Sequence, residues 1–211
     1  MTNVVAIVEG DGEVQALPVL LRRLSAWKTP QSTVKFETPI RVRRDRFVNR
    51  DDEFRRHVLL AAAKCRDDGW ILILLDADDD CPAIFGAQLL ERARGVARHR
   101  RISVVLANRE YEAWFIAAAL SLNGCRGFFA TSGAVDPELP RNAKGWIEDR
   151  MSSRSYGEMT DQSAFSARMD LEQAYARSRS FRKLCTEWVR QTDASGSCGV
   201  APPGRPTSPT D

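Results

Sequence analysis

Short apolar runs recur along the first 125 residues and predict strands. The runs 4–8, 70–75 and 102–106 are apolar at nearly every position, as in strands buried on both faces. Segment 33–42 alternates well enough for a further strand, and we expect Pro39 to break it. Of the four, 70–75 has the strongest strand pattern.

The segments between these runs repeat apolar residues every three or four positions and predict helices. We expect helices over 14–27, 52–66, 83–97 and 108–122. Pro18 is expected near the first turn of its helix, where proline is tolerated. The alternation of strand and helix predicts an α/β fold, a Rossmann-like sheet of mostly parallel strands flanked by helices.

The pattern changes after residue 125. The pattern of residues 126–190 predicts a helical extension with a loop at 133–140. Residues 191–211 are rich in Ser, Gly, Pro and Thr and predict a disordered tail. We therefore divide the chain into a domain at 1–125, the extension and the tail. The expected helices of the extension are 141–150, 164–178 and 181–189.

The composition excludes some kinds of catalytic and metal site, but it does not indicate a binding partner. The chain has 211 residues, five cysteines and two histidines, and a net charge of +3 that says little about partners. No cysteine pair is spaced CxxC, and two histidines are too few for a zinc site of several His or Cys ligands. An odd number of cysteines without a basic leader predicts reduced thiols in the cytoplasm. No apolar run reaches the roughly 18–20 residues of a membrane span.

Acidic residues follow three of the predicted strands. In an open α/β sheet, ligands bind beyond the carboxyl ends of the strands, so these acids are expected to converge. Carboxylates within a few ångström of one another repel unless they are protonated or bind a cation, and Mg²⁺ is a natural occupant. The Asp-x-Asp spacing lets both side chains point the same way. The acids are Glu9, Asp11 and Glu13, then Asp76, Asp78, Asp79 and Asp80, then Glu110 and Glu112.

Plainer interpretations compete with a metal site. Asp is a favoured N-cap, so Asp79 or Asp80 could cap the helix that begins at Pro82, although this would explain only one of four acids. The glycines Gly10 and Gly12 could form only a tight turn. They do not form a nucleotide phosphate loop, because no Gly-Lys-Ser/Thr follows.

The two acidic motifs together resemble the TOPRIM domain of primases, topoisomerases, recombination-repair proteins and overcoming-lysogenization-defect nucleases. The matching segments are Val8-Glu9-Gly10-Asp11-Gly12-Glu13 and Leu74-Leu75-Asp76-Ala77-Asp78. The resemblance implies phosphoryl transfer on nucleic acid with bound Mg²⁺. It assigns Glu9 as general acid/base or metal ligand, and Asp76 and Asp78 as catalytic metal ligands. The cysteine spacing denies the zinc ribbon that a primase would usually need.

The resemblance extends beyond these motifs. Segment Arg109-Glu110-Tyr111-Glu112-Ala113-Trp114 is similar to one in small uncharacterised bacterial TOPRIM-like proteins related to the overcoming-lysogenization-defect nucleases, which often lie near ATPases in phage-defence gene sets. The similarity continues through Lys144 and Tyr156 to Ser180-Phe181. It implies two Mg²⁺ or Mn²⁺ ions, with Glu13 and Glu112 as candidates for the second. Asp80 is counted with the metal ligands.

Basic residues adjoin the expected acidic site. Arg41, Arg43, Arg44 and Arg46 lie in one short stretch. They either form a solvated surface, the usual fate of a charge run, or contact the phosphates of DNA or RNA, which bare carboxylates would repel. Lys144 is likewise either a catalytic residue that stabilises phosphate charge or a surface lysine.

Three functions are compatible with these patterns. The first is a Mg²⁺/Mn²⁺-dependent nuclease, an effector in phage defence that acts with an ATPase partner. The second is a non-catalytic metal- or nucleic-acid-binding module of a larger complex. The third is a structural α/β protein whose acids only cap helices. No membrane partner is expected.

Overall fold

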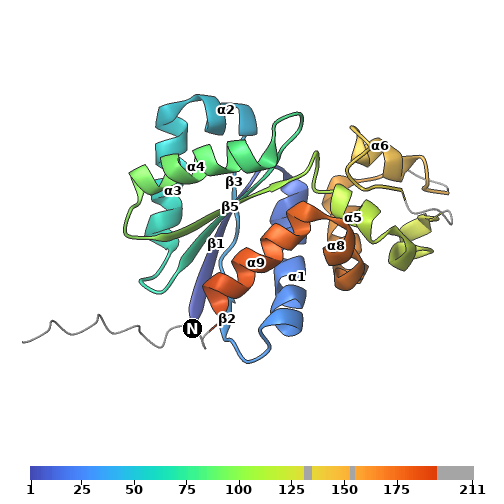
Figure 1. Cartoon of the computed structure of the whole chain (residues 1–211), viewed down its shortest axis with the longest axis horizontal. Coiled ribbons are helices and arrows are strands. Elements are labelled where there is room, and N and C mark those ends of the chain that lie inside the picture. The colour runs from blue at the N-terminus through green and yellow to red at the C-terminus, as the bar shows by residue number, and fades with distance from the viewer. Residues whose placement is uncertain (131–134, 153–154, 194–211) are drawn as a thin grey trace, which may run out of the picture.

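The computed structural model describes residues 1–130, 135–152 and 155–193, and its centre is a five-stranded sheet (Figure 1). The strand order is β2-β1-β4-β5, and β3 pairs with β1 beyond the end of β2. Every pairing between these strands is parallel, which confirms the predicted α/β class. The strands are β1 (Thr2–Val8), β2 (Val34–Phe36), β3 (Ile40–Arg41), β4 (Trp70–Asp76) and β5 (Arg101–Ala107).

Helices cover both faces of the sheet, so the strands are apolar on both sides. Val4 and Ala6 of β1 face one layer, whereas Val5 and Ile7 face the other, as the two-residue period of a strand requires. The first layer contains α1 (Asp11–Lys28) and α9 (Arg179–Thr192). The second contains α2 (Arg44–Asn49), α3 (Asp51–Lys64) and α4 (Pro82–Val96).

A group of short helices lies beyond the carboxyl ends of the strands (Figure 1). Their aromatic residues share the core of the α1 layer: Phe165 packs edge-on against Phe115 at 5.4 Å between ring centroids. The group contains α5 (Ala113–Ala117), α6 (Ala143–Glu148), α7 (Ser163–Arg168) and α8 (Leu171–Arg177). It also contains 3₁₀ turns at Ala119–Leu122 and Cys125–Gly127 and a π-helical turn at Glu158–Gln162.

Several predicted helix boundaries are wrong. The helix expected over 108–122 is reduced to α5 and a 3₁₀ turn. It begins late because Arg109 has a left-handed backbone with φ of 66° and turns the chain, and it ends early at Ala118, where φ is −111° and ψ is 21°. The helix expected over 164–178 is two helices. It is divided at Asp170, whose side chain accepts hydrogen bonds from the N–H groups of Glu172 and Gln173 and caps α8.

Helix α1 begins three residues earlier than predicted, which places Pro18 in its interior rather than near its first turn. The helix tolerates proline there at the loss of the hydrogen bond that residue 18 would donate to the Val14 carbonyl. Helix α2 was not predicted at all. Helix α9 extends to Thr192, two residues into the predicted tail. The rest of that tail, 194–211, and part of the predicted loop 133–140 lie outside the described residues.

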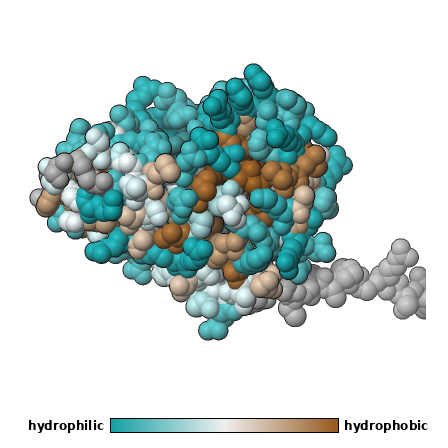
Figure 2. Space-filling view, turned by 180° about the vertical axis from the view of Figure 1, so that it is seen from behind, coloured by the Kyte–Doolittle hydropathy of each residue, from teal (hydrophilic) through white to brown (hydrophobic). Residues whose placement is uncertain are grey.

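Across the described parts of the chain, no helix combines the length and the apolar character needed to cross a membrane. Seen from behind, the surface is mostly hydrophilic, and apolar side chains gather toward its middle and one side (Figure 2).

Candidate active site

A pocket of about 420 Å³ lies at the carboxyl ends of β1 and β4 and collects most of the predicted site residues. It joins segments from β1, the β3–α2 region, β4, α6 and the π-helical turn. Its lining is both acidic and basic: Glu9, Glu13, Asp76, Asp78 and Glu158 face Arg41, Arg43, Arg44 and Lys144. The expected convergence of the strand-end acids is therefore present in the structure.

Glu9 follows the last residue of β1 and enters the pocket from the central part of the sheet. Its Oε2 atom is buried and accepts no hydrogen bond from any described residue. Burial raises the pKa of Glu9, and the nearby charge of Asp78 raises it further, while Arg44 lowers it in part. An unpartnered carboxylate oxygen in such a place is suited to a proton or a cation.

Asp76 is the last residue of β4, which pairs with β1. Its Oδ1 atom accepts a hydrogen bond from the Tyr111 backbone N–H at 2.8 Å, which orients the carboxylate. The pKa of Asp76 is raised well above its usual range by burial and then by the charges of Glu112, Glu13 and Glu9. The carboxylates therefore destabilise one another when all are charged.

Gln162 connects Glu13, which lines the pocket, to Glu112, which is buried behind it. The Gln162 Nε2 atom donates to Glu13 Oε1 at 2.9 Å and to Glu112 Oε1 at 3.2 Å. Glu13 Oε2 also accepts from the Gly10 N–H at 2.7 Å and so caps the start of α1. Both Glu13 oxygens are thus engaged in hydrogen bonds, which favours a supporting role over a ligand role.

Glu112 is fully buried and does not line the pocket. Its Oε1 accepts from the Tyr156 hydroxyl at 3.0 Å, and its Oε2 has no hydrogen-bond partner in the described parts of the chain. Burial raises the pKa of Glu112 to about 7, although Lys144 opposes the shift. A predicted second-ion ligand thus lies one layer deeper than expected.

Lys144 is a pocket residue rather than a free surface lysine. The first turn of α6 holds it, because its backbone N–H donates to Glu110 Oε2 at 2.9 Å. Its Nζ lies 3.0 Å from Glu158 Oε1. Burial would lower the pKa of Lys144, but the charges of Glu112, Glu158 and Asp76 outweigh burial and raise it. The ammonium group is therefore charged at neutral pH.

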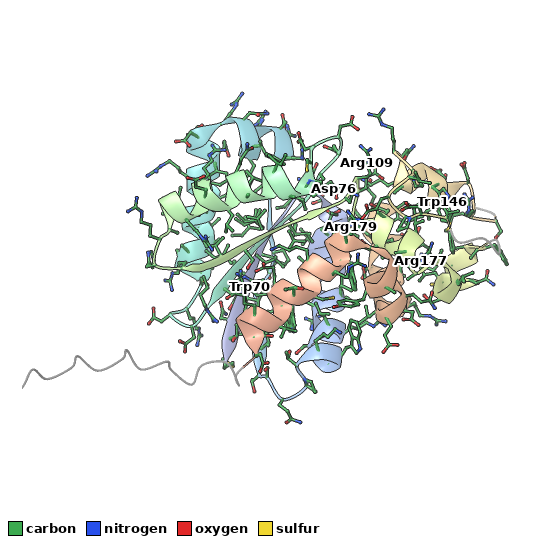
Figure 3. The ribbon with its side chains drawn as sticks, viewed as in Figure 1. Trp70, Asp76, Arg109, Trp146, Arg177 and Arg179 are labelled. Atoms are coloured by element: carbon green, nitrogen blue, oxygen red, sulfur yellow. The ribbon has the colours of Figure 1, made fainter. Side chains whose placement is uncertain are left out.

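The acidic loop after β4 is held by arginines. Arg44 Nη1 lies 3.3 Å from Asp78 Oδ2, and Arg44 Nη2 lies 2.8 Å from Asp80 Oδ2. Asp79 pairs with Arg109 at 2.7 Å and with Arg141 at 2.6 Å. Asp76 and Arg109 lie at the same end of the sheet (Figure 3). Asp80 therefore pairs with an arginine at the rim and does not line the pocket.

The interpretation of these acids as helix caps is wrong. The cap residue of α4 is Cys81, and no side chain accepts a hydrogen bond at that helix end. Asp78 instead has a left-handed backbone with φ of 50°, which is uncommon for a residue with a side chain. The loop is shaped by its ion pairs and by the Asp78 N–H, which donates to the Arg109 carbonyl at 2.9 Å.

Three of the four predicted phosphate-binding arginines line the pocket. Arg41 pairs with Asp11 at 3.0 Å, and Arg43 lies beside it on the same rim. Arg46 instead lines an adjoining hollow of about 250 Å³, which contains His57 and shares Arg41 and Arg43 with the pocket. Arg41 and Arg43 therefore stand between two neighbouring hollows near the carboxyl end of β3, with Arg44 in one and Arg46 in the other.

No group of three or more His, Cys, Asp or Glu side chains in the described residues is arranged to hold a metal ion as it stands. The donor chemistry nevertheless fits a hard divalent cation. Glu9 and Asp76 have raised pKa values, and Glu9 Oε2 has no partner among the residues described. Asp78 would have to leave Arg44 before it could join them.

Sequence reasoning missed Glu158, Gln162 and Arg141. They come from a π-helical turn and a loop, which have no hydrophobic period that could reveal them. One signal was present at Gly12: a Cβ atom there would lie 2.2 Å from Gln162 Oε1. A glycine inside the first turn of a helix indicates close packing against another segment, but the sequence does not say which segment.

Comparison with known proteins identifies a family but no function. No curated protein and no solved structure matches the chain significantly. One family model does match, and it covers residues 8–188, from the end of β1 to α9. The protein therefore belongs to the family described as a domain of unknown function, DUF4276.

Proposed function

We propose that the protein is a Mg²⁺- or Mn²⁺-dependent nuclease of TOPRIM type that hydrolyses phosphodiester bonds in DNA or RNA. The observation that carries the proposal is one pocket in which Glu9, Asp76 and Asp78 face Arg41, Arg43 and Lys144. A nuclease needs this combination, because acids that attract cations would otherwise repel a polyanionic substrate. The resemblance of the two acidic motifs to the TOPRIM domain supports the same reaction class.

Each group has a chemical role in this proposal. A bound divalent cation, or a pair of them, would neutralise charge on the scissile phosphate and lower the pKa of water. Glu9, Asp76 and Asp78 would hold the cations. Glu9 also has a raised pKa, so it is a better proton acceptor than an ordinary carboxylate and can take the proton of the attacking water.

The cations of the chain would act on the substrate phosphates. Lys144 is charged and lines the pocket, so it can stabilise negative charge that develops on the phosphate. Arg41 and Arg43 stand on the rim, where they can contact neighbouring phosphates of the same strand. Arg46 faces the adjoining hollow, which could take a phosphate farther along the strand.

A non-catalytic binding module is the second candidate, and the ion pairs of Arg44 favour it. Arg44 forms ion pairs with Asp78 and Asp80, and no three of the described carboxylates are already arranged to bind a metal ion. In this alternative the protein would bind metal or nucleic acid within a larger complex. In either case we propose that it acts in the cytoplasm, on the basis of its odd number of cysteines, and with an ATPase partner in phage defence, on the basis of the resemblance alone.

The direct test is incubation of the purified protein with plasmid, single-stranded DNA and tRNA, with Mn²⁺, Mg²⁺ or EDTA. Wild-type protein should cut at least one of these substrates only with a divalent ion. Asp76→Asn and Glu9→Gln should each reduce cleavage roughly 100-fold or more while the circular dichroism spectrum is unchanged. The matched controls are Asp52→Asn and Glu91→Gln, two exposed acids on α3 and α4.

The outcomes separate the candidates. Cleavage that persists in both site variants would overturn the proposal. Calorimetric binding of Mn²⁺ that Asp76→Asn abolishes, without cleavage of any substrate, would favour the binding module. Absence of both cleavage and Mn²⁺ binding would leave only a structural role for these acids.

A further inference from the structure

A second hollow, separate from the acidic pocket, runs along β5 between α4 and α9. Its volume is about 550 Å³, and Val104 and Leu106 of β5 form its floor. Figure 1 shows β5 passing between these two helices. We call this hollow the β5 groove. One end of it reaches Cys81 and Asn108, and the other extends toward Leu90 of α4.

β5 is the outermost strand on this side of the sheet and pairs only with β4 among the described strands. The Ala77 N–H donates to the Ala107 carbonyl, so the backbone of Ala107 faces the β4 side. Because backbone groups alternate in direction along a strand, those of Val104 and Leu106 point outward into the groove. No described residue forms a hydrogen bond with them across this edge, so the groove offers unpaired donors and acceptors.

The two walls of the β5 groove differ in chemistry. The α4 wall is small and apolar, with Ala83, Gly86, Ala87 and Leu90. The α9 wall is basic, because Arg179 and Lys183 project from it. Successive side chains of a strand point to opposite sides, so a strand laid in the groove would meet an apolar wall and a basic wall in alternation.

Of the two basic side chains on the α9 wall, only one forms an ion pair with another described residue. Lys183 pairs with Glu187 at 2.6 Å. The guanidinium group of Arg179 has no ion-pair partner in the part of the chain that the structure describes. The Arg179 backbone N–H donates a 3.4 Å hydrogen bond to Glu138, the one acid among the described residues that line the groove. Figure 3 places Arg179 at the start of α9, near the end of the sheet that carries Asp76.

We propose that the β5 groove binds an extended segment of a partner polypeptide in which apolar residues alternate with acidic ones. The segment would add to the sheet as a further strand. Its backbone would pair with Val104 and Leu106, its apolar side chains would pack against Gly86 and Leu90, and its carboxylates would face Arg179 and Lys183. The proposal does not depend on the nuclease activity, because the groove and the acidic pocket share no lining residue.

A second copy of the same chain fits the groove less well. Pairing of two β5 edges about a two-fold axis is antiparallel, so Arg101 of each copy would approach the carboxyl end of the other β5. Arg179 and Lys183 stand at that end. Like charges would then oppose one another across the new strand pair, which is destabilising. An acidic segment meets no such repulsion.

The test uses fluorescein-labelled peptides of about eight residues, a strand-like length, in which valine alternates with glutamate or with lysine. The glutamate peptide should bind wild-type protein with a Kd of roughly 1–100 μM, as fluorescence anisotropy measures. Hydrogen exchange should slow at the amides of Val104 and Leu106. The lysine peptide should not bind.

Two matched variants on one helix test the location. A Cβ atom at Gly86 would lie 3.9 Å from Leu106, so Gly86→Met places its side chain over the groove floor. A Cβ atom at Gly95, also in α4, meets nothing within 4 Å, so Gly95→Met is the control. Gly86→Met should weaken binding about tenfold or more, and Gly95→Met less than about twofold. Arg179→Glu should reverse the preference between the two peptides.

Each other outcome contradicts the proposal. Failure of the glutamate peptide to bind wild-type protein, or equal effects of the two glycine variants, would overturn it. Sedimentation that shows a dimer abolished by Gly86→Met would assign the groove to a second copy instead. Metal-dependent cleavage, measured in parallel, should be the same in Gly86→Met as in wild type, so the groove and the nuclease site are tested separately.

Discussion

Gln162 Nε2 lies 2.9 Å from Glu13 Oε1, although 149 residues separate the two in sequence. The bond ties the first turn of α1 to the π-helical turn of the C-terminal part. Since the same nitrogen also reaches Glu112, one amide links acids that follow two different strands. The predicted helical extension is therefore not an addition to the side of the site, because it supplies the groups that hold these acids in place.

The mutual repulsion of the acids predicts that removing one of them stabilises the metal-free protein. Asp76→Asn keeps an oxygen that can accept the Tyr111 N–H but removes a charge whose pKa is raised. In EDTA at pH 8 we expect its Tm to exceed that of wild type by about 2–4 °C, which corresponds to about 1 kcal/mol for a chain of this size. Differential scanning calorimetry measures the shift.

Mn²⁺ should reverse this order. Binding to the folded state raises the Tm of wild type, whereas Asp76→Asn should show little increase. Asp52→Asn, an exposed change of the same kind on α3, should behave as wild type with and without Mn²⁺. A Tm of Asp76→Asn below that of wild type in EDTA would contradict the repulsion.

Arg44 should affect metal and substrate in opposite directions. Its ion pairs with Asp78 and Asp80 compete with a cation, so Arg44→Gln should tighten Mn²⁺ binding about three- to tenfold. The same change should weaken nucleic-acid binding. The slope of log affinity against log salt concentration should fall by about 1, the value for the loss of one phosphate contact. Calorimetry and anisotropy measure the two effects. Arg46→Gln, which leaves the acidic loop untouched, is the control for the metal effect, and equal Mn²⁺ affinities in the two variants would exclude competition by Arg44.

Because the pKa of Glu112 is raised, we expect the free energy of unfolding to fall as pH rises. Its folded pKa of about 7 exceeds the usual 4.5, so the folded state binds more protons than the unfolded state between these values. In EDTA, the free energy of unfolding should therefore decrease between pH 4.5 and pH 7, by up to about 3 kcal/mol from this group. Glu112→Gln should remove much of that decrease in urea titrations. An unchanged slope would mean that Glu112 ionises as an ordinary carboxylate.

The contribution of Glu187 to the free energy of unfolding should depend on pH in the opposite direction. Burial would raise its pKa, but hydrogen bonds from Lys183 and Ser103, each at 2.6 Å, outweigh burial and lower it. Its stabilisation is therefore complete above the unfolded pKa and is lost as pH falls through the folded pKa. Glu187→Gln should destabilise the protein by about 1–2 kcal/mol at pH 7 and by less at pH 3.5. Chemical denaturation at both pH values tests this, with the exposed Glu91→Gln as control.

The sheet could be predicted because its signal is local. The runs 4–8, 70–75 and 102–106 are apolar on both faces, and each falls within a strand of the structure. The break at Pro39 is also present, since β2 ends at Phe36 and β3 begins at Ile40. Parallel strands place their carboxyl ends at one edge, so the meeting of Glu9 and Asp76 followed from the same pattern.

The contacts that hold the site residues in place could not be predicted, because they join segments that are distant in the sequence. No spacing in the sequence indicates that Arg44 would pair with Asp78 and Asp80, or that Tyr156 would donate to Glu112. Helix α2 was missed because only two of its six residues are apolar, which is too few to show a period.

Gly12 determines how closely the two halves of the site approach. Any other residue there would place a carbon atom 2.2 Å from the Gln162 side chain and 3.2 Å from the Glu158 carbonyl, both on the π-helical turn. Either the Gln162 amide would have to leave Glu13 and Glu112, or the turn would have to withdraw from α1 together with the carboxylate that pairs with the Lys144 ammonium group. The close fit of α1 against the π-helical turn therefore depends on a single missing methyl group, at a position that carries no charge and takes no part in the chemistry.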